Sequence, residues 1–202
     1  MSSSFRETFP VALNLAGRNV LVLGGGEEAE DKVEKLRLVG ARVTVVAERT
    51  CTGLARAAQR RELTWFARAF AVSDLFGTQL VMLTDPDVHL ARALRGLQRR
   101  HSFWLCAVDQ PDYSDVFLVS IVRRGPLQIG ISTGGGAPLL ARRERQGLEA
   151  GLDQRLAEFA HGFADLRAAL RHLPKAERVR LLEEALGGFA IDVQVSYPLQ
   201  KD

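Results

Sequence analysis

The chain has 202 residues, 47% of them hydrophobic, which is enough for one domain with an appendage or for two small domains. The 27 Lys and Arg nearly balance the 24 Asp and Glu, and the basic residues are scattered, which argues against a dedicated nucleic-acid-binding protein. No stretch approaches the roughly 18 consecutive apolar residues of a membrane span, and the N-terminus lacks the pattern of a signal peptide. The two cysteines are far apart in sequence. These features predict a reduced, cytoplasmic protein without nucleic-acid or membrane partners.

Apolar runs alternate with helix-length segments through the first half of the chain. The apolar and β-branched runs predict strands over 19–23, 41–48, 63–66, 78–85 and 102–109. The segments between them predict helices over 27–39, 50–61 and 87–100. Strands separated by helices are typical of βαβ units, so we expect an α/β fold whose parallel sheet is covered on both faces.

The pattern changes after Asp109. Two apolar runs, 116–122 and 127–132, flank a turn at 123–126, which predicts a hairpin outside the alternating order. An exposed apolar edge of this kind pairs readily with another chain. We therefore expect the hairpin to contribute to a homodimer.

The last third of the chain has the spacing of helices. Leucine and phenylalanine residues recur every three or four positions and predict a packed helical region over 139–172, with a further helix over 175–186 after Pro174. The tail, 189–198, alternates apolar and polar residues like a strand.

The stretch VLVLGGGEEAEDK, residues 20–32, passes from a predicted strand through three glycines into a predicted helix. It fits the pattern G-x-G-x-x-A with Gly24, Gly26 and Ala29 at the small positions. Gly24 permits a tight turn, Gly26 lets a pyrophosphate approach the backbone, and Ala29 lets the helix pack closely on the strand. The free N–H groups at the helix start favour phosphate binding. The stretch predicts a dinucleotide site, although an ordinary tight turn would use similar residues.

An acidic residue ends the second predicted strand. Glu48 follows Gly24 by 24 residues, close to the spacing of about 20 at which a carboxylate binds the adenosine ribose. Such a carboxylate favours NAD over NADP, whereas the neighbouring Arg49 could bind a 2′-phosphate. The alternative is that Glu48 is simply a solvated residue at a strand end.

Four segments, in this order, resemble motifs of the siroheme synthase dehydrogenase/ferrochelatase family. They lie between residues 9 and 145 and comprise GGGEEAEDK with Lys32, CAVDQP, IVRRGPLQIGIST and STGGGAP. The resemblance implies a Rossmann NAD-binding domain over 1–112, a dimerisation region over 113–145 and a C-terminal helical domain over 146–202. It also implies NAD-dependent oxidation of precorrin-2 to sirohydrochlorin and, as in many members, insertion of ferrous iron to give siroheme.

The resemblance assigns site residues as well. The implied cofactor-binding residues are Gly24, Gly25, Gly26, Glu27, Glu28, Glu48, Arg49, Thr84 and Asp85. The implied substrate-binding residues are Ser132 and Thr133, and we add Arg124 and Arg142 because the substrate carries carboxylates. Asp109, at a strand end, is the expected proton acceptor, its alternative being a turn cap ahead of Pro111. The isolated histidines do not have the spacing of a metal site, so iron is expected only as a transient substrate.

Some positions depart from the family pattern. The family usually has Asn, Phe, Pro and Ser where this chain has Cys106, Val116, Val119 and Ala137. These departures leave open a dehydrogenase without iron insertion. A second alternative is a redox-sensing regulator that binds NAD without turnover, but it would give no role to Asp109 or to the STGG loop.

Overall fold

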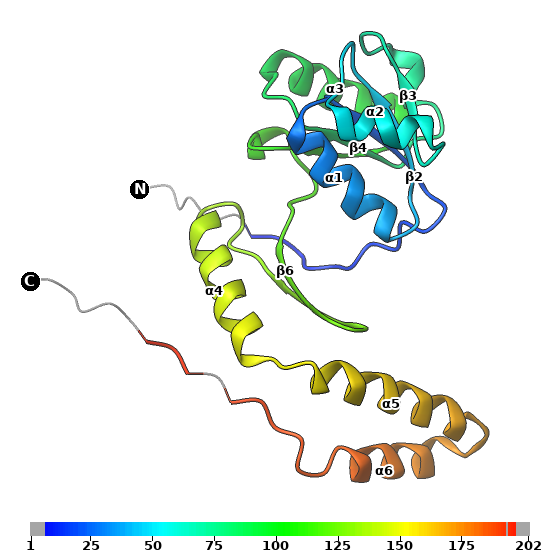
Figure 1. Ribbon diagram of the computed structural model, residues 1–202, viewed down its shortest axis with the longest axis vertical. Coiled ribbons are helices and arrows are strands. Elements are labelled where there is room, and N and C mark those ends of the chain that lie inside the picture. The colour runs from blue at the N-terminus through cyan, green and yellow to red at the C-terminus, as the bar shows by residue number, and fades with distance from the viewer. Residues whose placement is uncertain (1–6, 193, 197–202) are drawn as a thin grey trace, which may run out of the picture. The chain divides into compact units, whose positions relative to one another are not determined.

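The computed structural model describes residues 7–192 and 194–196, and its larger sheet has five strands (Figure 1). They are β1 (Asn19–Leu23), β2 (Arg42–Val46), β3 (Thr64–Phe66), β4 (Leu80–Leu83) and β5 (Trp104–Ala107). The order across the sheet is β3-β2-β1-β4-β5, and every neighbouring pair is parallel. The predicted α/β fold with a parallel sheet is confirmed.

Alternate residues of the central strands point into two hydrophobic cores, one on each face of the sheet. Val20 and Val22 of β1 pack into the core formed with α1 (Glu27–Leu38) and α2 (Thr52–Gln59). The intervening Leu21 belongs to the other core, which contains residues of α3 (Val88–His101). Because both faces are covered, the central strands β1 and β4 consist almost entirely of buried apolar residues.

The crossover from β3 to β4 lacks an α-helix and contains the 3-10 helix η1 (Val72–Leu75), which the sequence did not predict. Asp74 stabilises it by accepting a hydrogen bond from the backbone N–H of Ala71 at 2.9 Å and from both terminal nitrogens of Arg68. Leu75 is buried in the core on the α3 side. One short turn is too brief to show helical periodicity in the sequence.

The predicted hairpin is confirmed, with different bounds. It consists of antiparallel β6 (Ser120–Arg124) and β7 (Leu127–Ile131). The first strand begins four residues later than the run 116–122 suggested, and it includes two residues assigned to the turn. The reason is that Val116 donates its N–H to the carbonyl of Leu105 at 3.2 Å, so the start of the run pairs with β5.

The helical region predicted over 139–172 is interrupted. It contains α4 (Pro138–Gly151), α5 (Arg155–Ala169) and the 3-10 helix η3 (Leu170–His172), and α6 (Lys175–Ala185) follows. The break comes after Gly151, and just ahead of α5 the Asp153 carboxylate accepts from the N–H of Leu156 at 3.3 Å.

The strand predicted over 189–198 is wrong for the residues that can be checked. Residues 189–192 and 194–196 form no strand, and 193, 197 and 198 lie outside the described residues. An alternating sequence forms a strand only beside a partner strand, and the described part of the chain supplies none here. Over the same described part, no helix has the length and apolar character needed to cross a membrane, and the cytoplasmic location stays a prediction.

The chain forms two compact units. Of the described residues, the first comprises 7–119 together with Ser132–Ala141, and the second comprises Ser120–Ile131 and those from Arg142 onward. The functional division at 112/113 and 145/146 stays a prediction.

Candidate active site

The glycine loop between β1 and α1 packs against two neighbouring loops. A Cβ placed on Gly24 would lie 2.8 Å from the Asp85 carboxylate and closer still to Thr84 Oγ1, and Gly24 also has φ +129°. A Cβ on Gly25 would lie 3.0 Å from the carbonyl carbon of Arg49 and closer to its oxygen. Both positions therefore require glycine for packing within the protein itself.

Gly26 differs from its two neighbours. A Cβ there would meet no protein atom within 4 Å, and its φ of −82° is open to any residue. Gly26 caps the N-terminus of α1, and no side chain caps this helix end. Open space in front of unpaired helix N–H groups is what a pyrophosphate needs. The loop thus fits a dinucleotide.

The first two residues of α1, next to this space, are glutamates. Glu27 and Glu28 are both exposed. Glu28 forms an ion pair with Lys32 at 2.6 Å, one helical turn further along, so its carboxylate extends along the helix. Acidic residues in a first turn also favour the helix dipole. A direct contact of either glutamate with the cofactor stays a prediction.

Three strand ends meet at the glycine loop. The N–H and the hydroxyl of buried Thr84, after β4, both donate to the carbonyl of Leu23, at 2.9 and 3.1 Å. From the loop after β2, the Cys51 N–H donates to the carbonyl of Gly25 at 2.7 Å. Glu48 and Arg49 lie in that same loop and are exposed. The structure therefore brings the predicted cofactor residues to one edge of the sheet, the carboxyl edge, where open α/β sheets bind ligands.

Asp109 follows β5 at the same edge. It has φ +57°, an uncommon conformation for a residue other than glycine, and its side chain is exposed. Its carboxylate has no hydrogen bond or ion pair with any described residue. A turn cap would need such a bond to the following backbone. The geometry therefore favours a carboxylate available to a ligand over the turn-cap alternative.

Two side chains with buried polar atoms were missed by the sequence analysis. Among the described residues, neither the hydroxyl of Thr50 nor either polar atom of the Gln110 amide has a hydrogen-bond partner. Buried polar groups are normally paired, so these atoms are available to a ligand or to ordered water. Each directly follows a predicted site residue, Arg49 or Asp109, and that adjacency was the only indication in the sequence.

The predicted substrate hydroxyls hold the glycine turn ahead of α4. Ser132 Oγ accepts from the N–H of Gly134, and Thr133 Oγ1 accepts from the N–H of Ala137, both at 3.2 Å. Each hydroxyl keeps its hydrogen for another acceptor. This unit thus presents two donors from a fixed turn, and their contact with substrate stays a prediction.

The two predicted arginines belong to the second unit. Arg124 donates to the carbonyls of Leu152 at 2.7 Å, Arg123 at 2.8 Å and Glu149, so its guanidinium satisfies the C-terminal end of α4. Arg142, on α4, is exposed. Binding of substrate carboxylates by these arginines stays a prediction. In the described part of the chain, no three His, Cys, Asp or Glu side chains are grouped as a metal site would require.

Neither cysteine has the properties of a nucleophile. Burial raises the pKa of Cys106 to about 11, although Lys32 opposes the shift. Burial also raises the pKa of Cys51, and its thiol donates to the Glu30 carboxylate at 3.0 Å. Both thiols are protonated at neutral pH, and only a thiolate attacks readily.

The parallel sheet, the open glycine loop and the acidic end of β2 define a Rossmann-type nucleotide-binding protein. Residues 11–120 match the family described as putative NAD(P)-binding, and residues 124–150 match the family described as sirohaem biosynthesis protein central. The first match covers more than half of the chain, so the chain belongs to this NAD(P)-binding family. The predicted nicotinamide dinucleotide cofactor and the family resemblance are confirmed.

Similar proteins agree with this assignment. The chain is 35% identical over 182 residues to a siroheme synthase of Neisseria meningitidis serogroup C (strain 053442), and 37% identical over 187 residues to one of Xylella fastidiosa (strain M12). Each match covers 89% of this chain and 38% of the relative, so the chain spans well under half of their length. A solved structure described as SirC, precorrin-2 dehydrogenase, has the same fold, with a TM-score of 0.74, 23% identity and coverage of 88% of each chain.

Proposed function

We propose that this protein is an NAD-dependent dehydrogenase that oxidises precorrin-2 to sirohydrochlorin. The observation that carries the proposal is the pairing, at one sheet edge, of an open dinucleotide loop at Gly26 with the unengaged carboxylate of Asp109. The similarity to siroheme synthases and to a structure described as a precorrin-2 dehydrogenase supports the substrate class. A regulator that only binds NAD would have no use for that carboxylate.

Different residues of the first unit would bind different parts of the cofactor. The backbone at Gly26 and the first turn of α1 would hold the pyrophosphate, and Glu48 would accept a hydrogen bond from the ribose. Thr84 and Asp85 would border the cofactor beside Gly24. When bound, NAD supplies the acceptor for the hydride that the substrate loses.

Asp109 would take the proton that leaves with the hydride. A carboxylate at the end of β5 can act as a general base toward a carbon or nitrogen of the ring that it touches. Ser132 and Thr133 of the same unit would donate hydrogen bonds to substrate carboxylates. The chain's role is thus to orient the macrocycle and to remove one proton.

We include insertion of ferrous iron into sirohydrochlorin as a second candidate activity. Two ring protons must leave as the metal enters; Asp109 is a carboxylate free to accept one of them, and the other would pass to solvent water. Iron would be a substrate in transit, without a resident site. A dehydrogenase that leaves iron insertion to another protein is the alternative.

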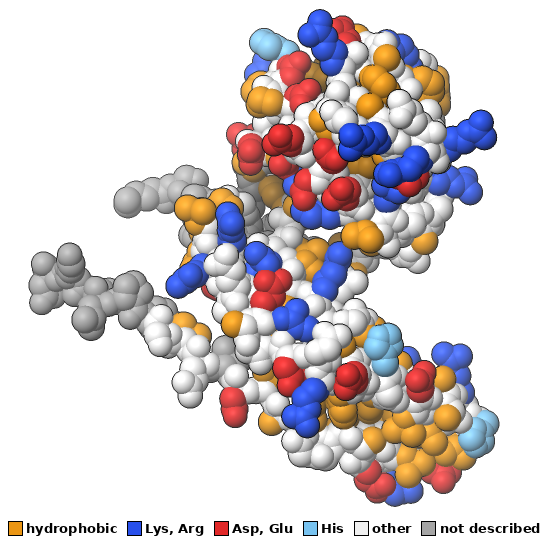
Figure 2. Space-filling view, viewed as in Figure 1, with side chains coloured by type: hydrophobic (Ala, Val, Ile, Leu, Met, Phe, Trp, Pro, Cys, Tyr) orange, Lys and Arg blue, Asp and Glu red, His pale blue; other side chains and the backbone are white. Residues whose placement is uncertain are grey.

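The second unit favours a homodimer. Large apolar side chains of α5, α6 and the segment that follows are at least a third exposed, among them Phe159, Val179, Leu186, Phe189 and Ile191. Hydrophobic side chains gather over the α5–α6 hairpin (Figure 2). Exposed apolar patches of this kind mark association surfaces, and a second copy of the chain would cover them.

The variant Asp109→Asn tests the proposal. It preserves size and most hydrogen bonding but removes the base, so oxidation of precorrin-2, followed by absorbance, should fall roughly 10²–10⁴-fold. NAD affinity should be unchanged because the glycine loop and Glu48 are intact. Incubation of the unmodified protein with sirohydrochlorin and ferrous iron, without NAD, tests the second activity separately.

Each outcome has a distinct meaning. Near-normal oxidation by a folded Asp109→Asn protein would remove Asp109 from the chemistry. Tight NAD binding by the unmodified protein without any oxidation of precorrin-2 would favour the regulator. Oxidation without iron insertion would leave a dedicated dehydrogenase.

A further inference from the structure

The last strand of the sheet, β5, is covered by the chain itself. After the loop that bears Asp109, Asp115 returns along β5 and its N–H donates to the carbonyl of Leu105 at 2.7 Å. In the opposite direction, the N–H of Leu105 donates to the Asp115 carboxylate at 3.1 Å. One residue therefore satisfies both outward-facing backbone groups of Leu105.

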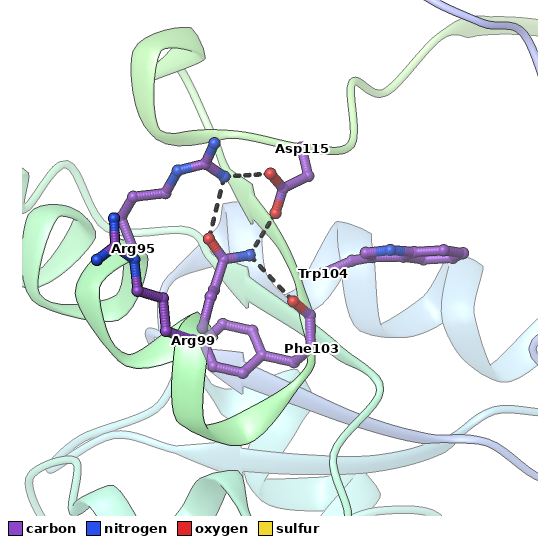
Figure 3. Close-up of a pocket in the computed structure, with 6 residues that line it drawn as sticks. Arg95, Arg99, Phe103, Trp104 and Asp115 are labelled. Atoms are coloured by element: carbon purple, nitrogen blue, oxygen red, sulfur yellow. Dashed lines mark hydrogen bonds and ion pairs between the residues drawn. The ribbon is translucent and has the colours of Figure 1, made fainter.

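The Asp115 carboxylate is also held from α3. Arg95 and the amide of Gln98 donate to its two oxygens, one to each (Figure 3). Gln98 donates in addition to the carbonyl of Phe103 at 3.0 Å and accepts from Arg95 at 3.0 Å, so the three side chains form one network. These side chains line a surface groove together with Arg99, and in Figure 3 no dashed line joins Arg99 to the other residues drawn.

Ser114 closes the base of the same loop. Its hydroxyl accepts from the N–H of Ala107 at 2.9 Å and lies 3.0 Å from the Ala107 carbonyl and 3.2 Å from that of Gln110, to which it can donate. The N–H of Gln110 also donates to the carbonyl of Ala107, at 3.1 Å. The loop between Ala107 and Ser114 is therefore closed by hydrogen bonds at both ends.

We propose that Asp115 is a positioning residue: clamped by Arg95 and Gln98, it fastens the loop that aims Asp109. A non-glycine residue persists at positive φ when its surroundings over-determine the conformation, and here Ser114 and Asp115 supply that constraint. Asp115 lies six residues after Asp109 in the sequence, and Arg95 and Gln98 already engage both oxygens of its carboxylate. The inference rests on the proposed role of Asp109 and goes beyond it by naming what holds that carboxylate in place.

The negative charge of the Asp115 carboxylate supports this positioning role. Burial raises the pKa of Asp115, but the hydrogen bonds from Gln98, Arg95 and the Leu105 N–H outweigh burial and hold its pKa below the usual value. The carboxylate is therefore ionised at every pH above its ordinary range. At neutral pH Asp115 therefore keeps its hydrogen bonds with Arg95 and Gln98.

A double-mutant cycle tests the proposal, using Asp115→Ala, Asp109→Asn and the two combined. Asp115→Ala should lower kcat for precorrin-2 oxidation about 10–100-fold, the effect of slightly misplacing a reacting group, with the Kd for NAD unchanged. In the Asp109→Asn background the same substitution should have almost no further effect, because residues that act as one unit are not additive. Arg99→Ala is the matched control, and its kcat should equal that of the unmodified protein.

The outcomes separate the clamp from the base. If Asp109→Asn is nearly fully active, the proposed role of Asp109 fails and the clamp has nothing to position. If Asp109→Asn is impaired and Asp115→Ala is either fully active or independent of it, the clamp is refuted. Should Asp115→Ala not fold, the same cycle with Ser114→Ala decides, since it loosens the loop from its other side.

Discussion

The glycine loop allows packing and ligand binding to be separated by two neighbouring substitutions. Gly26→Ala adds a methyl group where no protein atom lies within 4 Å, at a φ of −82°. The folded state should accept it. Alanine lowers the conformational entropy of the unfolded chain, which stabilises the protein by about 0.4–1 kcal/mol, but it caps a helix less well than glycine, which costs a similar amount. The free energy of unfolding should therefore change by less than about 1 kcal/mol.

Cofactor binding should respond quite differently. The added methyl would fill the space in which a pyrophosphate approaches the backbone. A hydrogen bond to a charged group contributes about 1.5–3 kcal/mol, and each 1.4 kcal/mol is tenfold in affinity, so loss of one such bond weakens NAD binding about 10–150-fold. Isothermal titration calorimetry measures the Kd for NAD. Thermal unfolding gives a second readout, because the increase in Tm that NAD causes should be smaller for Gly26→Ala than for the unmodified protein.

Gly25→Ala is the contrasting variant. Its methyl would press on the Arg49 backbone, with 3.0 Å to the carbonyl carbon and 3.1 Å to Ala47 Cβ. Overpacking of this kind costs about 1–3 kcal/mol, so the unliganded protein should lose stability. Wild-type NAD affinity in a stable Gly26→Ala protein would refute the placement of the pyrophosphate.

Three other predictions concern other parts of the molecule. Glu48→Ala should narrow the preference for NAD over NADP, because it removes both the acceptor for the ribose hydroxyl and the repulsion of a 2′-phosphate. If the ratio of the kcat/KM values for NAD and NADP is unchanged, Glu48 does not bind the ribose. A thiol reagent at pH 7.5 should label folded Cys51 more slowly than a free cysteine and Cys106 hardly at all, with labelling of Cys106 rising toward its pKa of about 11; rapid labelling of both would contradict their burial. Light scattering at micromolar concentration should give the mass of two chains, and a monomer would show that the apolar α5–α6 surface has another use.

The sheet and its helices were predictable because their evidence is local. The five strand runs and three helices have strong periodicities that the two cores then satisfy. The break after Gly151 and the helix η1 were not predictable from periodicity. Side-chain hydrogen bonds accompany both features, from Leu156 to Asp153 and from Ala71 and Arg68 to Asp74, and these become visible only in three dimensions.

The candidate site divides in the same way. Gly24, Gly25 and Gly26 look alike in sequence, and only the structure distinguishes two packing positions from one open one. Arg124 was selected for its charge, but its guanidinium donates to backbone carbonyls. Asp115 was not singled out at all, because its partners on α3 lie 17 and 20 residues before it.

The covered edge at β5 limits how the sheet can associate with other chains. Its outward-facing polar groups at Phe103, Leu105 and Ala107 are already bonded, to Gln98, Asp115 and Ser114. An extended peptide that adds to a sheet needs free N–H and carbonyl groups along the edge. A partner therefore cannot add a strand beside β5 without first displacing the chain's own residues. The same hydrogen bonds protect this edge from strand pairing between copies of the chain at high concentration.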